Sequence, residues 1–293
     1  MNVDNLTKQK LKYLEKMGRT LEREILKSYS NALKEVRGIL AEYGAKYELS
    51  KEEMYKYKRN EKLQNEITKE IRDVANDINR KIRVGTVDIY EDGYYRTAFV
   101  LENKTQIKLG FVELNRNVVR NAIENPLANL ALQRNRQNVV TNINQSIAQG
   151  LIRGRGYKDI AEGVKVALES NANNALRIAR TETHKVQVES NLDAMKHAEK
   201  IGVKFKKRWL ATLDDVTRDL HQDMDGEEVG LDERFSNGLL YPGDPAGSPE
   251  EVINCRCDII EVIEGYEPEM RRSRKDGNIP YSNYHEWKKN RLG

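Results

Sequence analysis

This sequence has few cysteines, prolines and aromatic residues. Its 293 residues include two cysteines, six prolines and 7% aromatic side chains. One residue separates the two cysteines. A disulfide between them would close a very small ring with strained geometry, so we expect reduced thiols or metal ligands. The sequence has no run of about 18 apolar residues and no apolar N-terminal stretch, so we expect neither a transmembrane helix nor a secretion signal. We therefore expect synthesis in a cytoplasm.

Charged residues, in contrast, are abundant. They reach 33% of the chain, which is typical of long amphipathic helices with large solvated faces, although an ordinary helix-rich domain would also fit. Apolar residues recur every three or four positions along three stretches, each of which predicts a helix. These residues are Leu14, Leu21, Ile25, Val36 and Leu40; then Leu63, Ile67, Ile71, Val74, Ile78 and Ile82; and finally Leu130, Val139, Ile143 and Ile147. Packing within the chain explains them best, although the second stripe would also suit a partner's helix.

Glycine and proline punctuate this pattern. The residues from Ser50 to Glu53 have the form of a capping box that opens the second helix, and Gly85 is expected to end it. Residues 99–109 fit a short helix or a hairpin. Breaks follow at 125–126, where a residue precedes proline, and at 150–156. The glycines of 150–156 lack the Lys-Ser/Thr of a P-loop, so a turn between helices is expected there, followed by helices at 157–168 and 172–200.

Charge marks the expected domain boundaries. Residues 209–268 hold 3 Lys plus Arg against 16 Asp plus Glu, whereas the segments before and after are basic. Strands are expected at residues 203–210, 227–231 and 257–263, and a short helix is expected at 214–224. A loop rich in glycine and proline lies between the last two strands. We predict a mostly α fold with three parts. These are an elongated helical N-terminal body (1–201), a small α+β C-terminal module (202–268) and a basic C-terminal tail (269–293).

The chemistry of the chain is concentrated between residues 209 and 257. His221, Cys255 and Cys257 would form a zinc site if they converge, since thiolates and imidazole are typical zinc ligands. Asp225, Asp219 or Asp214 would supply a fourth ligand. A zinc site of this kind would stabilise a small module that consists largely of loops. The alternative is two buried thiols beside a histidine that makes a local hydrogen bond.

Other polar residues of this stretch admit a catalytic and a structural interpretation. Asp214, Arg218, His221 and Asp225 would share one face of a helix. His221 could then act as a base oriented by a carboxylate, but a salt-bridged face is the more frequent outcome. Upstream, Arg180 and Glu182 suit ion pairs that fix the module to its preceding helix. We expect no enzyme activity.

Two basic clusters are candidates for DNA contact. Either could bind phosphate through charge alone, with strong dependence on salt and no reading of base sequence. Solvated surface is the alternative, because the aromatic residues found in single-strand binders are absent nearby. The clusters are Lys204, Lys206, Lys207 and Arg208, and Arg271, Arg272, Arg274 and Lys275.

The order of motifs resembles the phage Mu F-like minor head protein family, also called head morphogenesis proteins. The resemblance rests on Trp209, the Thr-Arg pair ending at Arg218, His221, Asp225-Gly226, Phe235, Pro242-Gly243 and Asn254-Cys-Arg-Cys257. It extends to the Ala-Arg-Thr-Glu run at 179–182 and to the tail from Met270 to Trp287, and so covers roughly residues 110–290.

The resemblance implies a structural minor capsid protein of a tailed phage. Its partners would be the portal protein, scaffolding or major capsid protein and non-specific double-stranded DNA, with no membrane and no small-molecule substrate. It would act in procapsid assembly, packaging or ejection, inside the capsid near the portal vertex, after synthesis in the bacterial host. The residues that build its module would be Arg180, Glu182, Trp209, Asp214, Arg218, His221, Asp225, Gly226, Phe235, Pro242, Asn254, Cys255, Arg256 and Cys257.

Two alternatives remain. One is a metal-dependent enzyme acting on nucleic acid through His221, Cys255 and Cys257. The other is a toxin-like effector module, which is disfavoured because about 25 residues follow the module.

Overall fold

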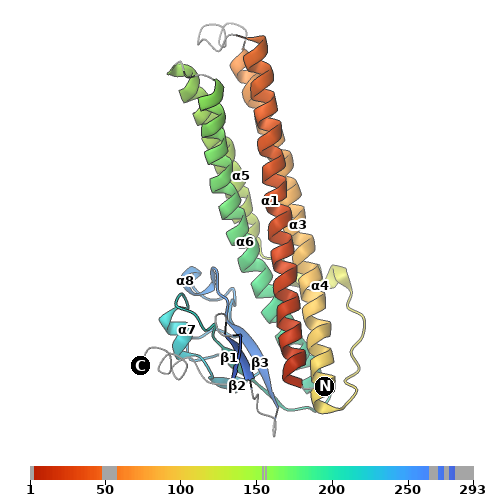
Figure 1. The fold of residues 1–293 in the computed structure, drawn as a ribbon. Helices are drawn as coiled ribbons and strands as arrows, with labels where there is room; N and C mark the ends of the chain where they lie inside the picture. Colours follow the sequence, from red (N-terminus) through yellow and green to blue (C-terminus); the bar gives the residue numbers. More distant parts are fainter. Residues whose placement is uncertain are drawn as a thin grey trace. The chain divides into compact units, whose positions relative to one another are not determined.

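Long helices dominate the fold. The structure, a computed structural model, describes residues 3–47, 58–153, 155, 157–263, 270–273 and 277–280. Its helices are α1 (Val3–Lys46), α3 (Arg59–Thr105), α4 (Arg116–Ile123), α5 (Pro126–Ile152), α6 (Tyr157–Lys200), α7 (Asp219–Asp223) and α8 (Pro249–Val252) (Figure 1). Its strands are β1 (Phe205–Leu210), β2 (Glu228–Gly230), β3 (Asp258–Ile263), β4 (Met270–Ser273) and β5 (Gly277–Pro280). The predicted mostly α class with a small C-terminal α+β module is confirmed.

The chain forms two compact units, each made of separate segments. The first contains Met1–Gly18, Gly85–Ile123 and Arg180–Gly293, and the second contains Arg19–Val84 and Glu124–Ala179. Helices α1, α3 and α6 therefore contribute residues to both units. The boundaries expected after residues 201 and 268 stay a prediction.

The predicted apolar stripes of the first two long helices are almost entirely buried. All five stripe residues of α1 are buried, as are those of α3 except the partly exposed Val74. Burial of a Leu or Ile side chain contributes about 1.5–3 kcal/mol, so such stripes hold long helices together where propensity alone would not. The capping box at 50–53 lies outside the described residues. Across the described helices, no segment is long and apolar enough to cross a membrane.

The stripe predicted for α5 was wrong at one position. Val139, Ile143 and Ile147 are buried, but Leu130 is 47% exposed. Leu130 lies nine residues before Val139, and nine steps of about 100° place it on the opposite side of a helix. The α5 helix starts at Pro126, within the break expected at 125–126, and the side chain of Asn125 accepts a hydrogen bond from the Leu127 backbone N–H (3.0 Å).

The prediction that Gly85 ends the second helix was wrong. Helix α3 continues through Gly85 and Gly93 to Thr105. An interior glycine costs only about 1 kcal/mol. The buried side chains of Val87, Ile89 and Leu101 beyond Gly85 more than offset it. Gly93 also serves packing, because a Cβ there would lie 2.2 Å from Oγ of Ser190 on α6.

The two helices predicted at 157–168 and 172–200 form one helix, α6. Asn171 interrupts the apolar pattern, but its side chain does not break the helix. Its Nδ2 donates to the carbonyl of Ala167 (2.8 Å), while its own carbonyl accepts from Asn135 Nδ2 (3.1 Å). Further back, a Cβ on Gly150 would lie 2.4 Å from Ile160 Cγ1, so this glycine permits close contact between α5 and α6.

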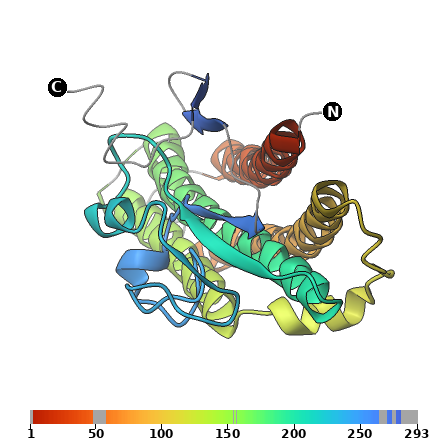
Figure 2. The same ribbon diagram turned by 90° about the horizontal axis from the view of Figure 1, so that it is seen from below.

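A small sheet packs against helices in the first unit. The strand order is β2-β1-β3, with both pairings antiparallel, and β4 and β5 form a separate hairpin. The inner face of the sheet contributes Phe205, Trp209 and Ile259 to a core that also contains Leu101 of α3 and Leu192 of α6. Figure 2 shows the ribbon from a second direction. The module therefore shares its apolar core with α3 and α6.

Candidate functional site

Trp209 lies at the centre of the module. Its side chain is fully buried, and its ring makes edge-on contacts with Phe235 (5.1 Å between centroids) and His221 (5.4 Å). Its backbone is held on both sides, because its N–H donates to Glu227 and its carbonyl accepts from Gly226. Gly226 has φ = 89°, a conformation that glycine adopts without strain, and so turns the chain from α7 towards β2.

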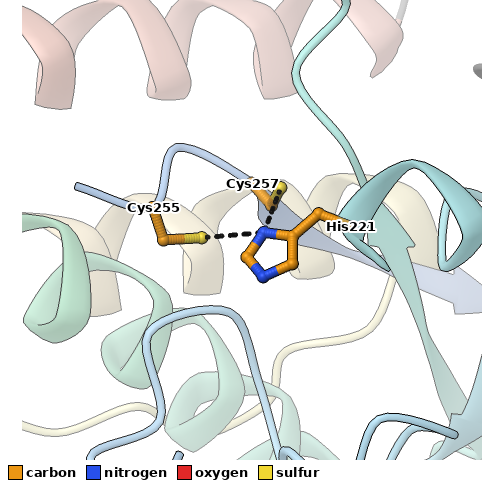
Figure 3. A group of neighbouring side chains, drawn as sticks. All are labelled: His221, Cys255 and Cys257. Atoms are coloured by element: carbon orange, nitrogen blue, oxygen red, sulfur yellow. Dashed lines mark hydrogen bonds between the residues drawn. The ribbon is translucent and has the colours of Figure 1, made fainter. Parts of the chain in front are cut away.

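His221, Cys255 and Cys257 converge in the buried interior beside this ring. Nδ1 of His221 lies 3.6 Å from Sγ of Cys255 and 3.4 Å from Sγ of Cys257 (Figure 3). The histidine comes from α7, and the cysteines come from the segment that leads into β3. Because they are two residues apart in an extended segment, both thiols point to the same side. The sequence-predicted convergence of these three residues is therefore present in the structure.

The two thiols differ in their proton affinity. A hydrogen bond from the Cys257 thiol lowers the pKa of Cys255, and the nearby Arg218 guanidinium acts in the same direction. The same hydrogen bond, together with burial, raises the pKa of Cys257 well above its ordinary value.

The predicted helix at 214–224 is much shorter, which changes the roles of its carboxylates. Only Asp219–Asp223 is helical, so Asp214 and Asp225 do not share a helix face with His221. Asp214 accepts a bidentate ion pair from Arg256, and Asp225 accepts the Ala211 backbone N–H (2.7 Å). The side chain of Asp219 is exposed. Each carboxylate therefore stabilises the loops or faces solvent, and none joins the thiols.

Arg218 and Asn254 fix the segment that carries the cysteines. Arg218 donates to the carbonyls of Glu251 (3.4 Å) and Ile253 (2.5 Å). Asn254 has φ = 56°, which asparagine tolerates better than most residues, and its N–H donates to Thr181 Oγ1 on α6 (3.2 Å). These contacts place Cys255 and Cys257 beside α7.

Helix α6 holds the module through residues to which the sequence assigned no role. Nε2 of His184 lies 2.6 Å from the carbonyl of Cys257, while Gln187 and Asn191 donate to the carboxylate of Asp258 (3.0 and 3.1 Å). Arg180 and Glu182 lie on the same helix, and Glu182 is buried. The sequence signal for the contacts of His184, Gln187 and Asn191 was weak, since these residues merely follow Arg180 and Glu182 on the same helix. Their partners, Cys257 and Asp258, are set by how β3 packs against α6.

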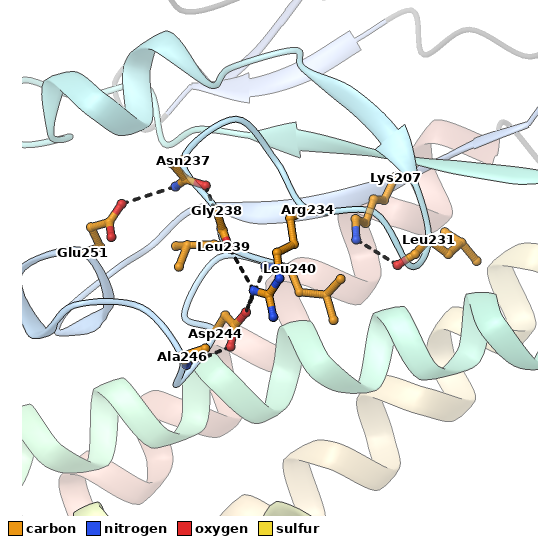
Figure 4. Close-up of polar contacts among 10 residues, drawn as sticks. All are labelled: Lys207, Leu231, Arg234, Asn237, Gly238, Leu239, Leu240, Asp244, Ala246 and Glu251. Carbon is orange, nitrogen blue, oxygen red and sulfur yellow. Dashed lines mark hydrogen bonds and ion pairs between the residues drawn. The ribbon is translucent and has the colours of Figure 1, made fainter.

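The long connection between β2 and α8 is held by Asp244. Its carboxylate accepts from the backbone N–H groups of Leu240 (2.9 Å) and Ala246 (2.9 Å) and from Arg234 (3.3 Å) (Figure 4). Phe235 and Pro242 of this connection are buried. The segment expected to be an extended loop is thus a folded part of the module.

The basic cluster at 204–208 is only half available to a partner. Lys204 and Lys206 are exposed, but Lys207 is fully buried and donates to the carbonyl of Leu231 (2.8 Å). Burial lowers the pKa of Lys207 to about 8. Arg208 is also buried and pairs with Glu228. The prediction that these two residues contact DNA was wrong. Lys207 shares the inner face of β1 with Phe205 and Trp209, since every second residue of a strand faces the same side. Arg208 lies on the other face, where Glu228 of β2 holds its guanidinium.

The second basic cluster cannot be placed as a surface. Arg271 and Arg272 lie in β4, where only the backbone is described, and Arg274 and Lys275 lie outside the described residues. DNA contact by these four stays a prediction.

A cavity borders the His-Cys-Cys group. It has a volume of about 290 Å³, and its lining includes His221, Cys257, Thr212, Arg218 and Asn254. Nε2 of His221 is itself buried and has no hydrogen-bond partner among the described residues. The group is thus buried but next to a polar space.

The chain is similar to proteins of phage heads and of bacteria. The model of the family described as Phage Mu protein F like protein matches residues 141–260, which include α6, β1, β2, the start of β3 and the His-Cys-Cys group. Minor head protein GP7 of Bacillus phage SPP1 is 33% identical over 297 residues, which cover 95% of this chain and 95% of that protein.

Two other relatives match over smaller parts. An Enterococcus faecalis protein named NAD(+)-arginine ADP-ribosyltransferase EFV is 34% identical over 209 residues, or 69% of this chain and 43% of that protein. An uncharacterized protein of Haemophilus influenzae is 27% identical over 59% of this chain and 36% of its own length. The chain thus spans less than half of either relative. No solved structure matches it.

Proposed function

Since this chain belongs to the Phage Mu protein F like family of phage minor head proteins, we propose that it is a structural minor capsid protein that binds the portal and contacts packaged DNA. It would lie inside the capsid near the portal vertex and act in head assembly, packaging or ejection. The observation that carries this proposal is the match to a minor head protein over 95% of both chains. The module residues support it, because those with reactive side chains hold loops and strands together.

The portal would bind the module at its exposed apolar edge. Val216 and Leu220 are 75% and 60% exposed, and Arg218 between them ties this loop to Ile253, which is also exposed. Large apolar side chains rimmed by polar groups are typical of protein interfaces. The surrounding segment, residues 209–268, carries 16 acidic against 3 basic residues, which would favour a basic portal surface.

We expect the double variant Val216→Ser, Leu220→Ser to bind portal at least about tenfold more weakly, because an interface depends on a few buried apolar side chains. The measurement is coexpression with the portal protein of the same phage, followed by capture of tagged portal and quantification of the bound chain. The matched control is Val112→Ser, Val118→Ser, whose side chains are 69% and 64% exposed elsewhere in the first unit. Equal retention of both variants, or no capture of the unaltered chain, would contradict portal binding by this edge.

Two exposed lysines, Lys204 just before β1 and Lys206 within it, would contact DNA phosphates. We expect Lys204→Ala, Lys206→Ala to reduce the slope of log affinity against log salt concentration by about 1 for each lysine, as loss of a phosphate contact requires. Gel shifts of linear double-stranded DNA at several salt concentrations, with divalent metal present, measure this slope. The control is Lys62→Ala, Lys69→Ala, which removes two exposed charges from α3. An unchanged slope would exclude these lysines, and shortened DNA would favour the metal-dependent nuclease instead.

A further inference from the structure

We propose that His221, Cys255 and Cys257 bind a zinc ion that fastens α7 to the start of β3. The proposal goes beyond the head-protein function and does not depend on it. Each of the three residues offers one ligand atom, and these atoms all lie within 4.8 Å of one another. All three side chains are buried, and both cysteines are free thiols.

The distances between the ligand atoms fit a tetrahedral zinc site. With Zn–S bonds of about 2.3 Å and Zn–N bonds of about 2.0–2.1 Å, tetrahedral angles place nitrogen and sulfur about 3.5 Å apart. The observed separations from His221 Nδ1 are 3.4 Å to Cys257 Sγ and 3.6 Å to Cys255 Sγ. Both nitrogen–sulfur separations therefore match those of a tetrahedral zinc site.

Hydrogen bonding alone explains this arrangement poorly. Nδ1 of an imidazole either donates one hydrogen bond or accepts one through its single lone pair. Here two sulfur atoms approach the same nitrogen, so at most one of them has a full hydrogen bond to it. A metal ion at the common centre binds all three atoms at once (Figure 3).

The ligand types select the metal. Two thiolates and an imidazole suit zinc, whereas calcium and magnesium prefer oxygen ligands. The two thiolate charges also neutralise Zn²⁺, so the buried site carries no net charge.

The fourth ligand is exchangeable. Within the described ranges, no further histidine, cysteine or carboxylate joins the three ligand atoms, and Asp214 and Asp225 are engaged with Arg256 and Ala211. The cavity of about 290 Å³ borders two of the ligands, His221 and Cys257. Water from this cavity is the fourth zinc ligand, and a small anion or thiol can replace this water.

Cobalt substitution of the full-length chain tests the proposal. We expect the purified protein to contain about one zinc per chain, and Co²⁺ added to the apoprotein to give a thiolate-to-cobalt charge-transfer band and strong tetrahedral visible bands. Cys255→Ser and His221→Gln should weaken or remove these bands. The matched control is His197→Gln, since Nε2 of His197 instead binds the carbonyl of Leu109 in the same unit.

The spectrum of the unaltered chain tests the zinc site even where a variant fails to fold. Added azide or a small thiol should shift the visible bands if the fourth position is open, and an unchanged spectrum would exclude that open position. Less than about a tenth of an equivalent of metal in the purified protein, together with no charge-transfer band on cobalt titration, would overturn the zinc site. Stoichiometric copper or iron in place of zinc would also overturn it.

Discussion

Replacing Trp209 by alanine is expected to lower the free energy of unfolding by about 3–5 kcal/mol, the range for deleting a large buried aromatic side chain. The indole is fully buried and contacts both Phe235 and His221. Its loss leaves a cavity between the sheet and the cysteine-bearing segment. Urea unfolding of the full chain, followed by circular dichroism, measures the change.

A control separates the loss of this core from the loss of any large aromatic group. Phe99 on α3 is 55% exposed, so Phe99→Ala should change stability by no more than about 0.5 kcal/mol, as is usual at the surface. Similar losses for the two variants would contradict the central role of Trp209. Full stability of the Trp209→Ala protein would also contradict this role.

The second large effect concerns a buried ion pair between α3 and β3. Lys104 Nζ lies 2.7 Å from Glu261 Oε1, and the two side chains are only 5% and 0% exposed. Lys104→Met is expected to cost about 3–5 kcal/mol, because it leaves the Glu261 carboxylate buried without its charge partner. Lys104→Met, Glu261→Met should recover much of that loss, since it removes both charges.

The pH dependence of this effect follows from the carboxylate. Burial alone would raise the pKa of Glu261, but attraction to Lys104 and Lys10, together with the hydrogen bond from Lys104, outweighs it and lowers this pKa below its ordinary value. The stabilisation by the pair is therefore present above the unfolded-state pKa, about 4.3, and is lost as pH falls through the lower folded-state pKa. The difference between Lys104→Met and the unaltered chain should shrink at acid pH.

An exposed ion pair provides the control. Lys165 and Glu162 on α6 are 34% and 59% exposed, and Lys165→Met should cost less than about 1 kcal/mol. A loss for Lys104→Met no larger than this, or a double variant less stable than Lys104→Met, would contradict the buried pair.

The sequence predicted those features that depend on local spacing. Apolar stripes such as Leu63 to Ile82 repeat at the helical period, so their burial follows from geometry. The positions of β1 and β3 follow in the same way from short alternating or apolar runs. The convergence of His221 with Cys255 and Cys257 was predictable because few other ligands of that type exist in the chain.

The remaining features depend on contacts distant in sequence. Gly85 was predicted to end the helix because the low helix propensity of glycine can be recognised from the sequence. The burial of Leu101, which offsets this cost, depends on the tertiary fold. The length of α7 and the engagement of Asp214 with Arg256 depend on loops folding against each other. His184 and Asn191 acquire their partners only where β3 meets α6.

The segmented composition of the first unit bears on how the chain folds during synthesis. All residues of the second unit have been made once Ala179 is added, so this unit can fold while translation continues. The first unit cannot, because Lys10 must meet Asn191, 181 residues later, and β1 must wait for β3. Contacts so distant in sequence form slowly. The sheet and the exposed loop that carries Val216 can therefore form only after β3, which ends at Ile263, has been synthesised.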